Sequence, residues 1–380
     1  MFTRAKVRCP LLPPRTRGKP VAGWPAGGLA RGMDLERFDP GIDAGSVRAC
    51  HDIYLAGARA DNPRWPPMTL PVFRSWLTYG WTEDPSQAWL ARDRTGEACG
   101  WYVLSLPERE NRHIARLSPA VHPARRRAGL GTALVAHGAR GAHEAGRTLL
   151  AAESDEASAG EAFARALGAR QELSEIRRVL RLDSVPAGRL STLRRRAESA
   201  ARGYSLVPWY GPVPEDRLDE VVAIFGAEAD APREAGREAQ RWDAARVRLS
   251  DERAAAQGLR HYTIAARREP GGELVGFTEL VVDPLDPGWG FQGLTAVVAP
   301  HRGHRLGLLT KVAMLELLAE REPQITQIVT GNADGNEHMI VINAELGYEV
   351  LDRLLSWELK TARAPALANL GSAGGATARP

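Results

Sequence analysis

An internal repeat constrains this chain of 380 residues more than any other feature. The segment that begins Ala-Val-His-Pro at residue 120 recurs, at a constant offset of 176 residues, in the segment that begins Ala-Val-Val-Ala at residue 296. The offset and a later three-residue insertion pair these residues of the two copies: Val121 with Val297, Arg126 with Arg302, Gly131 with Gly307, and Leu167 with Leu346. Because the period is the length of a domain, the sequence predicts a tandem duplication rather than a solenoid.

Both copies are expected to run through the same elements: a strand, an Arg/Gly loop, a helix, a short strand, a second helix and a final strand. The expected strands lie at 114–121, 148–152 and 176–182 in the first copy and at 294–298, 325–330 and 350–359 in the second. Strands and helices interleave, so the fold class is α+β, or mixed α/β. The expected domains are 34–184 and 204–361, joined by a linker at 185–203 and flanked by tails at 1–33 and 362–380.

The positive charge of the chain lies in its first segment. Residues 1–32 carry seven Lys or Arg and no acid, whereas the rest holds 43 basic against 46 acidic residues. We read the Pro/Gly/Arg-rich tail as disordered, and Met33 as an alternative start of the folded sequence. Because the folded body is slightly acidic, nucleic acid is not expected as a partner.

Composition also limits the cellular compartment and the metal sites that we expect. No run reaches the ~18 apolar residues of a membrane-spanning helix, and the tail lacks the apolar core of a secretory signal. Three scattered cysteines fit a reducing cytoplasm, and the histidines show no HxxxH or HxH pair. We therefore expect a cytoplasmic protein with no membrane partner and no metal.

The loop that carries the chemistry joins a strand to a helix in each copy. In the first copy it reads Arg-Arg-Ala-Gly-Leu-Gly over 126–131. The first amides of a helix have no intrahelical partner, so such a loop binds anions, and glycines allow a phosphate close to the backbone. No Gly-Lys-Ser/Thr follows, and the first glycine of GxGxxG is missing, so neither a Walker A loop nor a dinucleotide fingerprint is indicated.

These residues resemble the acyl-CoA loop of the GNAT superfamily of N-acetyltransferases, Arg/Gln-x-x-Gly-x-Gly/Ala after a strand that ends in Val-x-Pro. The first copy matches it through Val121, Pro123, Arg126, Gly129 and Gly131. The second copy carries Arg305 in place of the first glycine. With two copies in one chain, the architecture is similar to tandem actinobacterial members such as mycothiol synthase. The resemblance implies two tandem domains, each with a mixed, mostly antiparallel sheet and splayed parallel central strands.

The resemblance also implies acetyl-CoA as cosubstrate, held between the splayed strands with its pyrophosphate on the loop amides. The residues that this places at the cofactor are Val121, Arg126, Arg127, Gly129 and Gly131 in the first copy and Val297, Val298, Arg302, Gly303, His304, Arg305, Leu306, Gly307, Asn332 and Asn336 in the second. Turn and N-cap chemistry is the alternative for the two asparagines.

Acyl transfer to an amine needs a base and an acid for the departing thiolate. Glu279, in an otherwise apolar strand, is the predicted base, with a solvent-facing strand residue as the alternative. The family's usual acid is a tyrosine, and its position holds Asn343 in the second copy and Ala164 in the first. We take Asn343 as the catalytic-site residue there and leave the acid unassigned. Gln292 and Thr295 are the predicted substrate-binding residues.

The second copy has the richer set of polar side chains, so we expect catalysis there. The expected function is acetyl-CoA-dependent acetylation of a primary amine, with a small-molecule acceptor and a monomer or homodimer. Three alternatives stay open: a peptide amine as acceptor, acetylation of a cysteinyl amine as in mycothiol synthase, and a degenerate protein that binds acyl-CoA without turnover.

Overall fold

The computed structural model describes residues 33–80, 86–227, 236–363 and 366. Of the two predicted tails, only Met33, residues 362–363 and residue 366 fall within this part. The strands are β1 (Asp34–Phe38), β2 (Ser86–Arg92), β3 (Ala98–Ser105), β4 (Ile114–Val121), β5 (Leu149–Asp155), β6 (Arg170–Arg181), β7 (Tyr204–Tyr210), β8 (Arg260–Arg268), β9 (Leu274–Val282), β10 (Trp289–Val297), β11 (Gln327–Ala333) and β12 (Glu349–Lys360). The helices are α1 (Ala44–Asp61), α2 (Leu70–Tyr79), α3 (Leu130–Glu144), α4 (Ala159–Ala166), α5 (Arg189–Ala200), α6 (Leu218–Gly226), α7 (Ala244–Gln257), α8 (Leu306–Arg321) and α9 (Glu337–Leu346).

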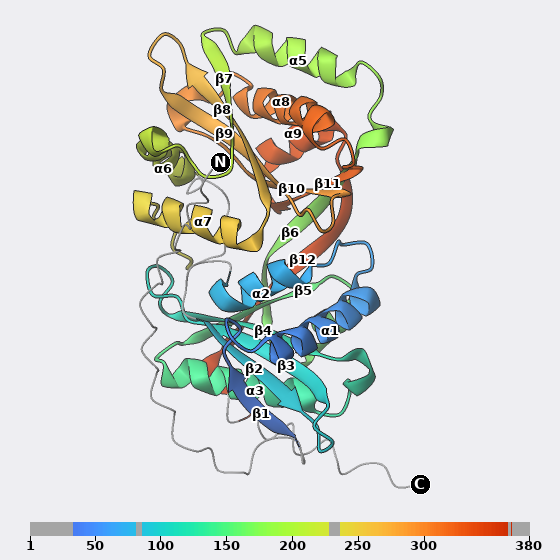
Figure 1. Cartoon of the computed structure of the whole chain (residues 1–380). Helices are drawn as coiled ribbons and strands as arrows, with labels where there is room; N and C mark the ends of the chain where they lie inside the picture. The colour runs from blue at the N-terminus through green and yellow to red at the C-terminus, as the bar shows by residue number, and fades with distance from the viewer. Residues whose placement is uncertain (1–32, 81–85, 228–235, 364–365, 367–380) are drawn as a thin grey trace, which may run out of the picture.

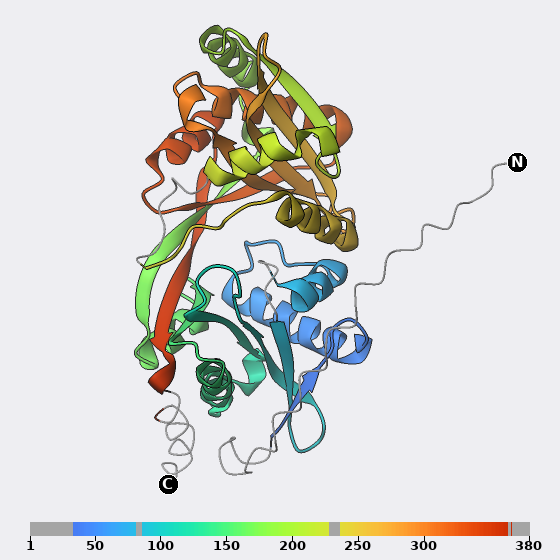
Figure 2. The same cartoon turned by 90° about the vertical axis from the view of Figure 1, so that its left-hand side faces the viewer.

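All these strands join one twelve-stranded sheet, in the order β1-β2-β3-β4-β5-β12-β6-β11-β10-β9-β8-β7. From each end of the sheet inward, the two copies contribute the same succession of strands, except that their last strands are exchanged. The last strand of the second copy, β12, lies beside β5, and the last strand of the first copy, β6, lies beside β11. Figure 2 shows these two long strands, green and red, running side by side between the halves. Each half therefore contains a strand of the other copy.

Helices cover both faces of each half (Figure 1). In the first half, α3 packs on one face, through a core that includes Leu117 and Leu134, and α1 and α2 pack on the other, through Phe73 and Trp101. In the second half, α8 takes the place of α3, and α6 with α7 take the place of α1 with α2. The mixed α+β class and the tandem arrangement expected from the repeat are confirmed.

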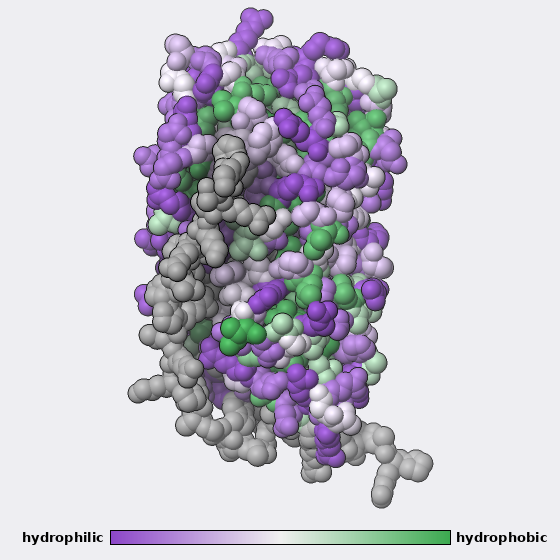
Figure 3. Space-filling model, in the orientation of Figure 1, coloured by the Kyte–Doolittle hydropathy of each residue, from purple (hydrophilic) through white to green (hydrophobic). Residues whose placement is uncertain are grey.

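The segment expected as a linker holds a helix. α5 packs against α8 through Leu193 and Ala197, which are buried in the core of the second half. Hydrophilic residues cover much of the face seen in Figure 3, and the apolar ones lie among them in small groups. Among the described residues, no helix is long and apolar enough to cross a membrane.

Candidate acyl-CoA and acceptor site

A gap opens between two parallel strands in each half. β4 pairs with β5 only from Ile114 to Arg116, although β4 continues to Val121. In the second half, β10 pairs with β11 only from Trp289 to Phe291 and continues to Val297. Beyond these short ladders the strands diverge, so backbone groups on their facing edges are left to bind a ligand. The splayed parallel strands expected in both copies are therefore present.

The two loops share one backbone conformation despite their different sequences. The equivalent residues Arg127 and Gly303 both have a positive φ, 65° and 85°. The next equivalent pair, Gly129 and Arg305, also has positive φ values of 82° and 55°. Each loop thus places one arginine and one glycine in the left-handed region, where a side chain costs about 1 kcal/mol. Arg305 in place of a glycine leaves the shape of the loop intact.

Each loop leads directly into a helix whose first amides have no intrahelical acceptor. In α3 the helical bonds begin with the N–H of Ala133, which donates to Gly129 O, and in α8 with Leu309, which donates to Arg305 O. The free amides before them, with the positive end of the helix dipole, can hold a pyrophosphate. A Cβ at Gly131 would lie 3.3 Å from Phe163 of α4, and one at Gly307 would lie 3.4 Å from Ile342 of α9. Both glycines therefore let the second helix approach the loop.

The equivalent arginines Arg126 and Arg302 bond back to the end of the strand that precedes each loop. Nε of Arg302 donates to the carbonyl of Val297 at 2.9 Å, and Nε of Arg126 points in the same way to Val121 O at 3.4 Å. Arg126 also forms a bidentate ion pair with Asp61, at the end of α1, at 2.8 and 2.6 Å. In the first half, therefore, this guanidinium holds α1 against the loop.

The second loop is held by α5, β7 and β9. His301 Nδ1 lies 2.8 Å from the hydroxyl of Tyr204, and His304 Nδ1 lies 3.4 Å from the carbonyl of Ala200, the last residue of α5. Val298 donates its N–H to Val275 of β9 at 2.9 Å. These contacts give both histidines a structural role in the loop.

Only the second half has a bulge in its gap strand. Between Gln292 and Thr295 the register of β10 against β9 shifts by one residue, whereas β4 pairs with β3 without interruption from Arg116 to Val121. A bulge frees backbone groups from the ladder and redirects nearby side chains. In the first half, the part of β4 beyond its ladder with β5 holds Pro119, which has no N–H to offer.

The two predicted substrate residues lie on the α8 face of the sheet. Nε2 of Gln292 donates to the hydroxyl of Thr278 at 3.0 Å, and that hydroxyl lies 2.7 Å from Thr295 Oγ1. Glu279 follows Thr278 in β9, so its side chain points to the opposite face, where it lies beside Gly293 of the bulge. The structure thus joins Gln292 to Thr295 through Thr278 and places both on the opposite face from the Glu279 side chain, although Nε2 of Gln292 also donates to the backbone carbonyl of Glu279. Thr278, which sequence reasoning missed, is the centre of this polar cluster.

Asn343 lies in a buried polar chain. Its side chain is fully buried, its Oδ1 accepts from Nζ of Lys311 at 2.8 Å, and its Nδ2 donates to Oδ1 of Asn332 at 2.7 Å. Burial lowers the pKa of Lys311 to about 7. Sequence reasoning did not select Lys311. Its single signal is a lysine within an otherwise apolar helical run.

The remaining asparagine has a different task. Asn336 is the N-cap of α9, and its side chain accepts from the N–H of Met339 at 3.4 Å. The N-cap role is the alternative prediction for Asn336. Tyr348, after the Leu-Gly pair, is buried in the core with its ring 5.2 Å from Lys311 Nζ. The positions equivalent to Lys311 and Asn343 in the first copy are Val135 and Ala164, so the buried polar chain belongs to the second half alone.

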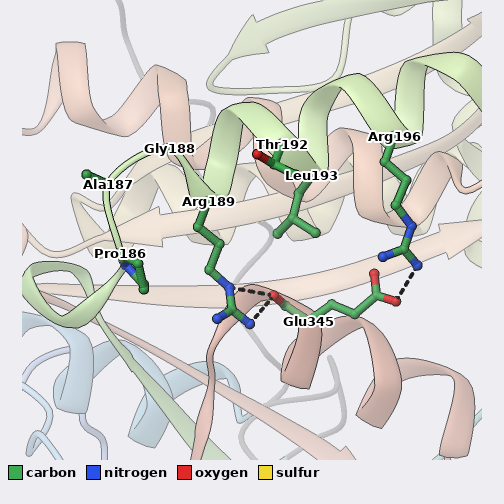
Figure 4. A pocket seen from close by; sticks show the side chains of 8 residues that line it. All are labelled: Pro186, Ala187, Gly188, Arg189, Thr192, Leu193, Arg196 and Glu345. Carbon is green, nitrogen blue, oxygen red and sulfur yellow. Dashed lines mark hydrogen bonds and ion pairs between the residues drawn. The ribbon is translucent and has the colours of Figure 1, made fainter.

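A surface pocket lies between α5 and α9 (Figure 4). Arg189 donates to the backbone carbonyl of Glu345, and Arg196 donates to its carboxylate at 2.8 Å. Arg305 of the second loop lies 3.6 Å from the other carboxylate oxygen. The two arginines that line this pocket are thus both hydrogen-bonded to Glu345. No group of three or more His, Cys, Asp or Glu side chains within the described ranges is arranged to hold a metal ion.

Known proteins match this architecture. Residues 50–169 match the model of the acetyltransferase (GNAT) family. A tandem GNAT protein from the clavulanic acid biosynthesis pathway, solved without AcCoA, is 28% identical over 87% of this chain and 98% of that one, with a TM-score of 0.71. No curated protein matches the chain.

Two more distant structures share the fold. A GCN5-related N-acetyltransferase from Sphaerobacter thermophilus is 17% identical, with a TM-score of 0.61 over 88% of this chain and 97% of that one. A putative acetyltransferase from Pyrococcus horikoshii is 14% identical, with a TM-score of 0.51 over 87% and 90%. These findings show a GNAT acetyltransferase domain at residues 50–169, and the fold of the whole chain is similar to that of a tandem GNAT protein.

Proposed function

We propose that the chain transfers an acetyl group from acetyl-CoA to a primary amine of a small molecule, and that the second half catalyses the reaction. One observation carries this proposal: the second half combines a splayed gap, a bulged gap strand and a carboxylate, Glu279, beside the bulge. At the positions of Glu279, Thr295 and Asn343, the first copy has Val103, Pro119 and Ala164. None of these three can accept or donate a proton.

The residues of the second half fit acetyl-CoA. The amides of Leu306 and Gly307 at the start of α8 would hold the pyrophosphate, and the free edge of β10 up to Val297 would bind the pantetheine arm. Asn332, oriented by Asn343, offers its amide nitrogen as a further donor. When bound, acetyl-CoA supplies the activated acetyl thioester.

Glu279 acts as the base in this proposal. An amine attacks only when it is neutral, so the ammonium form must lose a proton before the C–N bond forms and the C–S bond breaks. Glu279 is half-buried, on the face opposite α8, and takes that proton. The amide of Asn343 carries no acidic proton. Once the C–N bond has formed, the attacking nitrogen gives its second proton to water, and the departing thiolate takes its proton from that water.

Replacement of the base tests the proposal. In Glu279→Gln, kcat with an accepted amine should fall by about 100-fold, while the dissociation constant for acetyl-CoA stays unchanged. Glu320→Gln, at the exposed end of α8, is the matched control and should leave kcat unchanged. Full turnover in the Glu279 variant would overturn the assignment.

A second function is supported by one observation. Neither half has a phenol at the position of the family's acid, where Asn343 and Ala164 stand. A protein that binds acyl-CoA without turnover fits that departure. Tight binding of acetyl-CoA with no acetylation of any amine in a broad panel would favour it over the enzyme.

A further inference from the structure

Two carboxylates flank the gap of the second half, one from each neighbouring strand. Glu279 of β9 lies beside Gly293 of β10, where an added Cβ would be 3.7 Å from its Oε2. Glu175 of β6 lies directly over Gly331 of β11, where an added Cβ would be only 1.8 Å from its Oε1. β10 and β11 are the strands that diverge, and both glycines lie two residues beyond the last pair, Phe291 with Val329. The carboxylates therefore stand on either side of the opening.

Both carboxylates lie on the same face of the sheet. Register partners on the four neighbouring strands share a face, and here they are Val281, Phe291, Val329 and Val179. Glu279 and Glu175 lie two and four residues from the ends of this row along their own strands, so the side-chain period of two puts them on that face. It is the face opposite α8, on which Trp65 of the first half packs against the apolar members of the row.

Glu175 comes from the first copy and reaches the second gap through the strand exchange. Its pKa is raised by burial and, to a smaller extent, by the charges of Glu153 on β5 and Asp352 on β12, while Arg177 on β6 opposes the shift. The guanidinium of Arg177 is engaged by Asp155 and Asp352. Among the described residues, no hydrogen bond or ion pair reaches the Glu175 carboxylate. It is a partly buried anion whose nearest cation already serves other carboxylates.

We infer that Glu175 belongs to the acceptor site of the second half, and that with Glu279 it selects acceptors that carry a second cationic group besides the amine to be acetylated. This rests on the proposed function. One carboxylate takes the proton of the reacting amine, and the other binds the second ammonium by a charge-assisted hydrogen bond. The apolar row borders the opening at the closed end of the gap, and Phe291 there suits contact with an alkyl spacer.

The test compares α,ω-diamines of three to five carbons with amino alcohols of the same length, using the full chain and acetyl-CoA. For the best diamine, kcat/KM should exceed that of its amino alcohol by about tenfold. In Glu175→Gln this ratio should fall toward one, through a higher KM for the diamine. Gly331→Ala, which keeps the charge but displaces the Glu175 carboxylate, should lower the ratio as well.

Glu153→Gln provides the matched control, because it neutralises a neighbouring carboxylate outside the proposed site. It should keep the diamine preference and move the acidic limb of the kcat/KM profile for the diamine to lower pH, since the Glu153 charge raises the Glu175 pKa. Acetylation with equal efficiency for diamines and amino alcohols, or a preference unchanged in Glu175→Gln, would overturn the inference and leave the proposed function standing. If bound acetyl-CoA acetylates no amine, the proposed function fails and the inference with it.

Discussion

Lys311 and Asn343 are joined by a hydrogen bond of 2.8 Å in the core of the second half, where their residues are 2% and 0% exposed. Nζ of Lys311 is the donor of this bond, so it fixes the Asn343 amide with Oδ1 toward Lys311 and Nδ2 toward Asn332. Asn332 accepts through its oxygen, which leaves its nitrogen as the donor for a ligand. The buried Lys311 thereby determines that Asn332 presents a hydrogen-bond donor to the gap.

We expect Lys311→Met to weaken acetyl-CoA binding. Without the Lys311 donor, the Asn343 amide loses its fixed orientation. Asn332, which Asn343 orients, then loses its alignment as well. The KM for acetyl-CoA should rise by about tenfold, the order of one lost hydrogen bond, while the KM for the amine stays the same. Lys360→Met, at the exposed end of β12, is the control. Equal rises in both KM values would indicate general loosening of the fold instead.

Stability should depend on pH through the same lysine. Burial lowers its pKa from 10.5 to about 7, so between these values the unfolded chain holds a proton that the folded chain has lost. The Lys311 contribution to the free energy of unfolding should therefore increase with pH across this window, by at most about 1.4 kcal/mol per unit. Urea unfolding of the wild type and Lys311→Met from pH 6 to 9 measures it. A constant difference between the two would contradict this burial.

The strand exchange should depend on the pair Arg177–Asp352. Asp352 of β12 accepts from Nε of Arg177 at 2.5 Å and from Asn62 at 2.6 Å, and the paired side chains are 7% and 8% exposed. Asp352→Ala leaves a buried charge with one partner fewer and should cost about 3–5 kcal/mol. Glu349→Ala, which removes the exposed pair with Arg181 between the same two strands, should cost less than about 1 kcal/mol. Denaturant titration of both variants measures the difference, and similar costs would refute the role of the buried pair.

Arg305 should be replaceable by glycine. Its φ of 55° is already in the region that glycine enters without penalty, and its side chain lies near Glu345. Arg305→Gly should therefore keep the affinity for acetyl-CoA within about threefold, less than 1 kcal/mol. A loss of more than tenfold would show that the guanidinium itself binds the phosphate.

The repeat was enough to predict the local plan of the fold. The first gap strand has the predicted limits, 114–121, and both loops and the helices after them lie where the offset puts them. The second gap strand starts five residues before its predicted 294, because Gly290 and Gly293 hide its strand character. The helix α5 left a signal in the spacing of Leu190, Leu193 and Ala197, which its many arginines obscured.

The strand exchange could not be predicted from the sequence. A final strand can pair with the short strand of its own copy, β5 for β6 and β11 for β12, or with the equivalent strand of the other copy, with similar backbone hydrogen bonds in each case. Local pattern is the same for both, so the choice depends on contacts between copies, such as Arg177 with Asp352. For the same reason Glu175 gave no signal as a site residue, since its sequence neighbours belong to the other half. The burial of Lys311 gave no signal either, because it depends on tertiary packing around the whole circumference of α8.

The second half is proposed to hold the working site. Ala128 and His304 are equivalent, exposed loop residues, so Ala128→Glu and His304→Glu place the same charge beside the two anion sites, and His304→Ala controls for loss of the contact between His304 and Ala200. Calorimetric titration of the full chain with acetyl-CoA, with the acetylation rate measured in parallel, compares them. We predict that His304→Glu weakens the binding that supports turnover by roughly tenfold, and that Ala128→Glu leaves both that binding and the rate unchanged. Loss of turnover in Ala128→Glu, with His304→Glu active, would place the reaction in the first half and contradict this account.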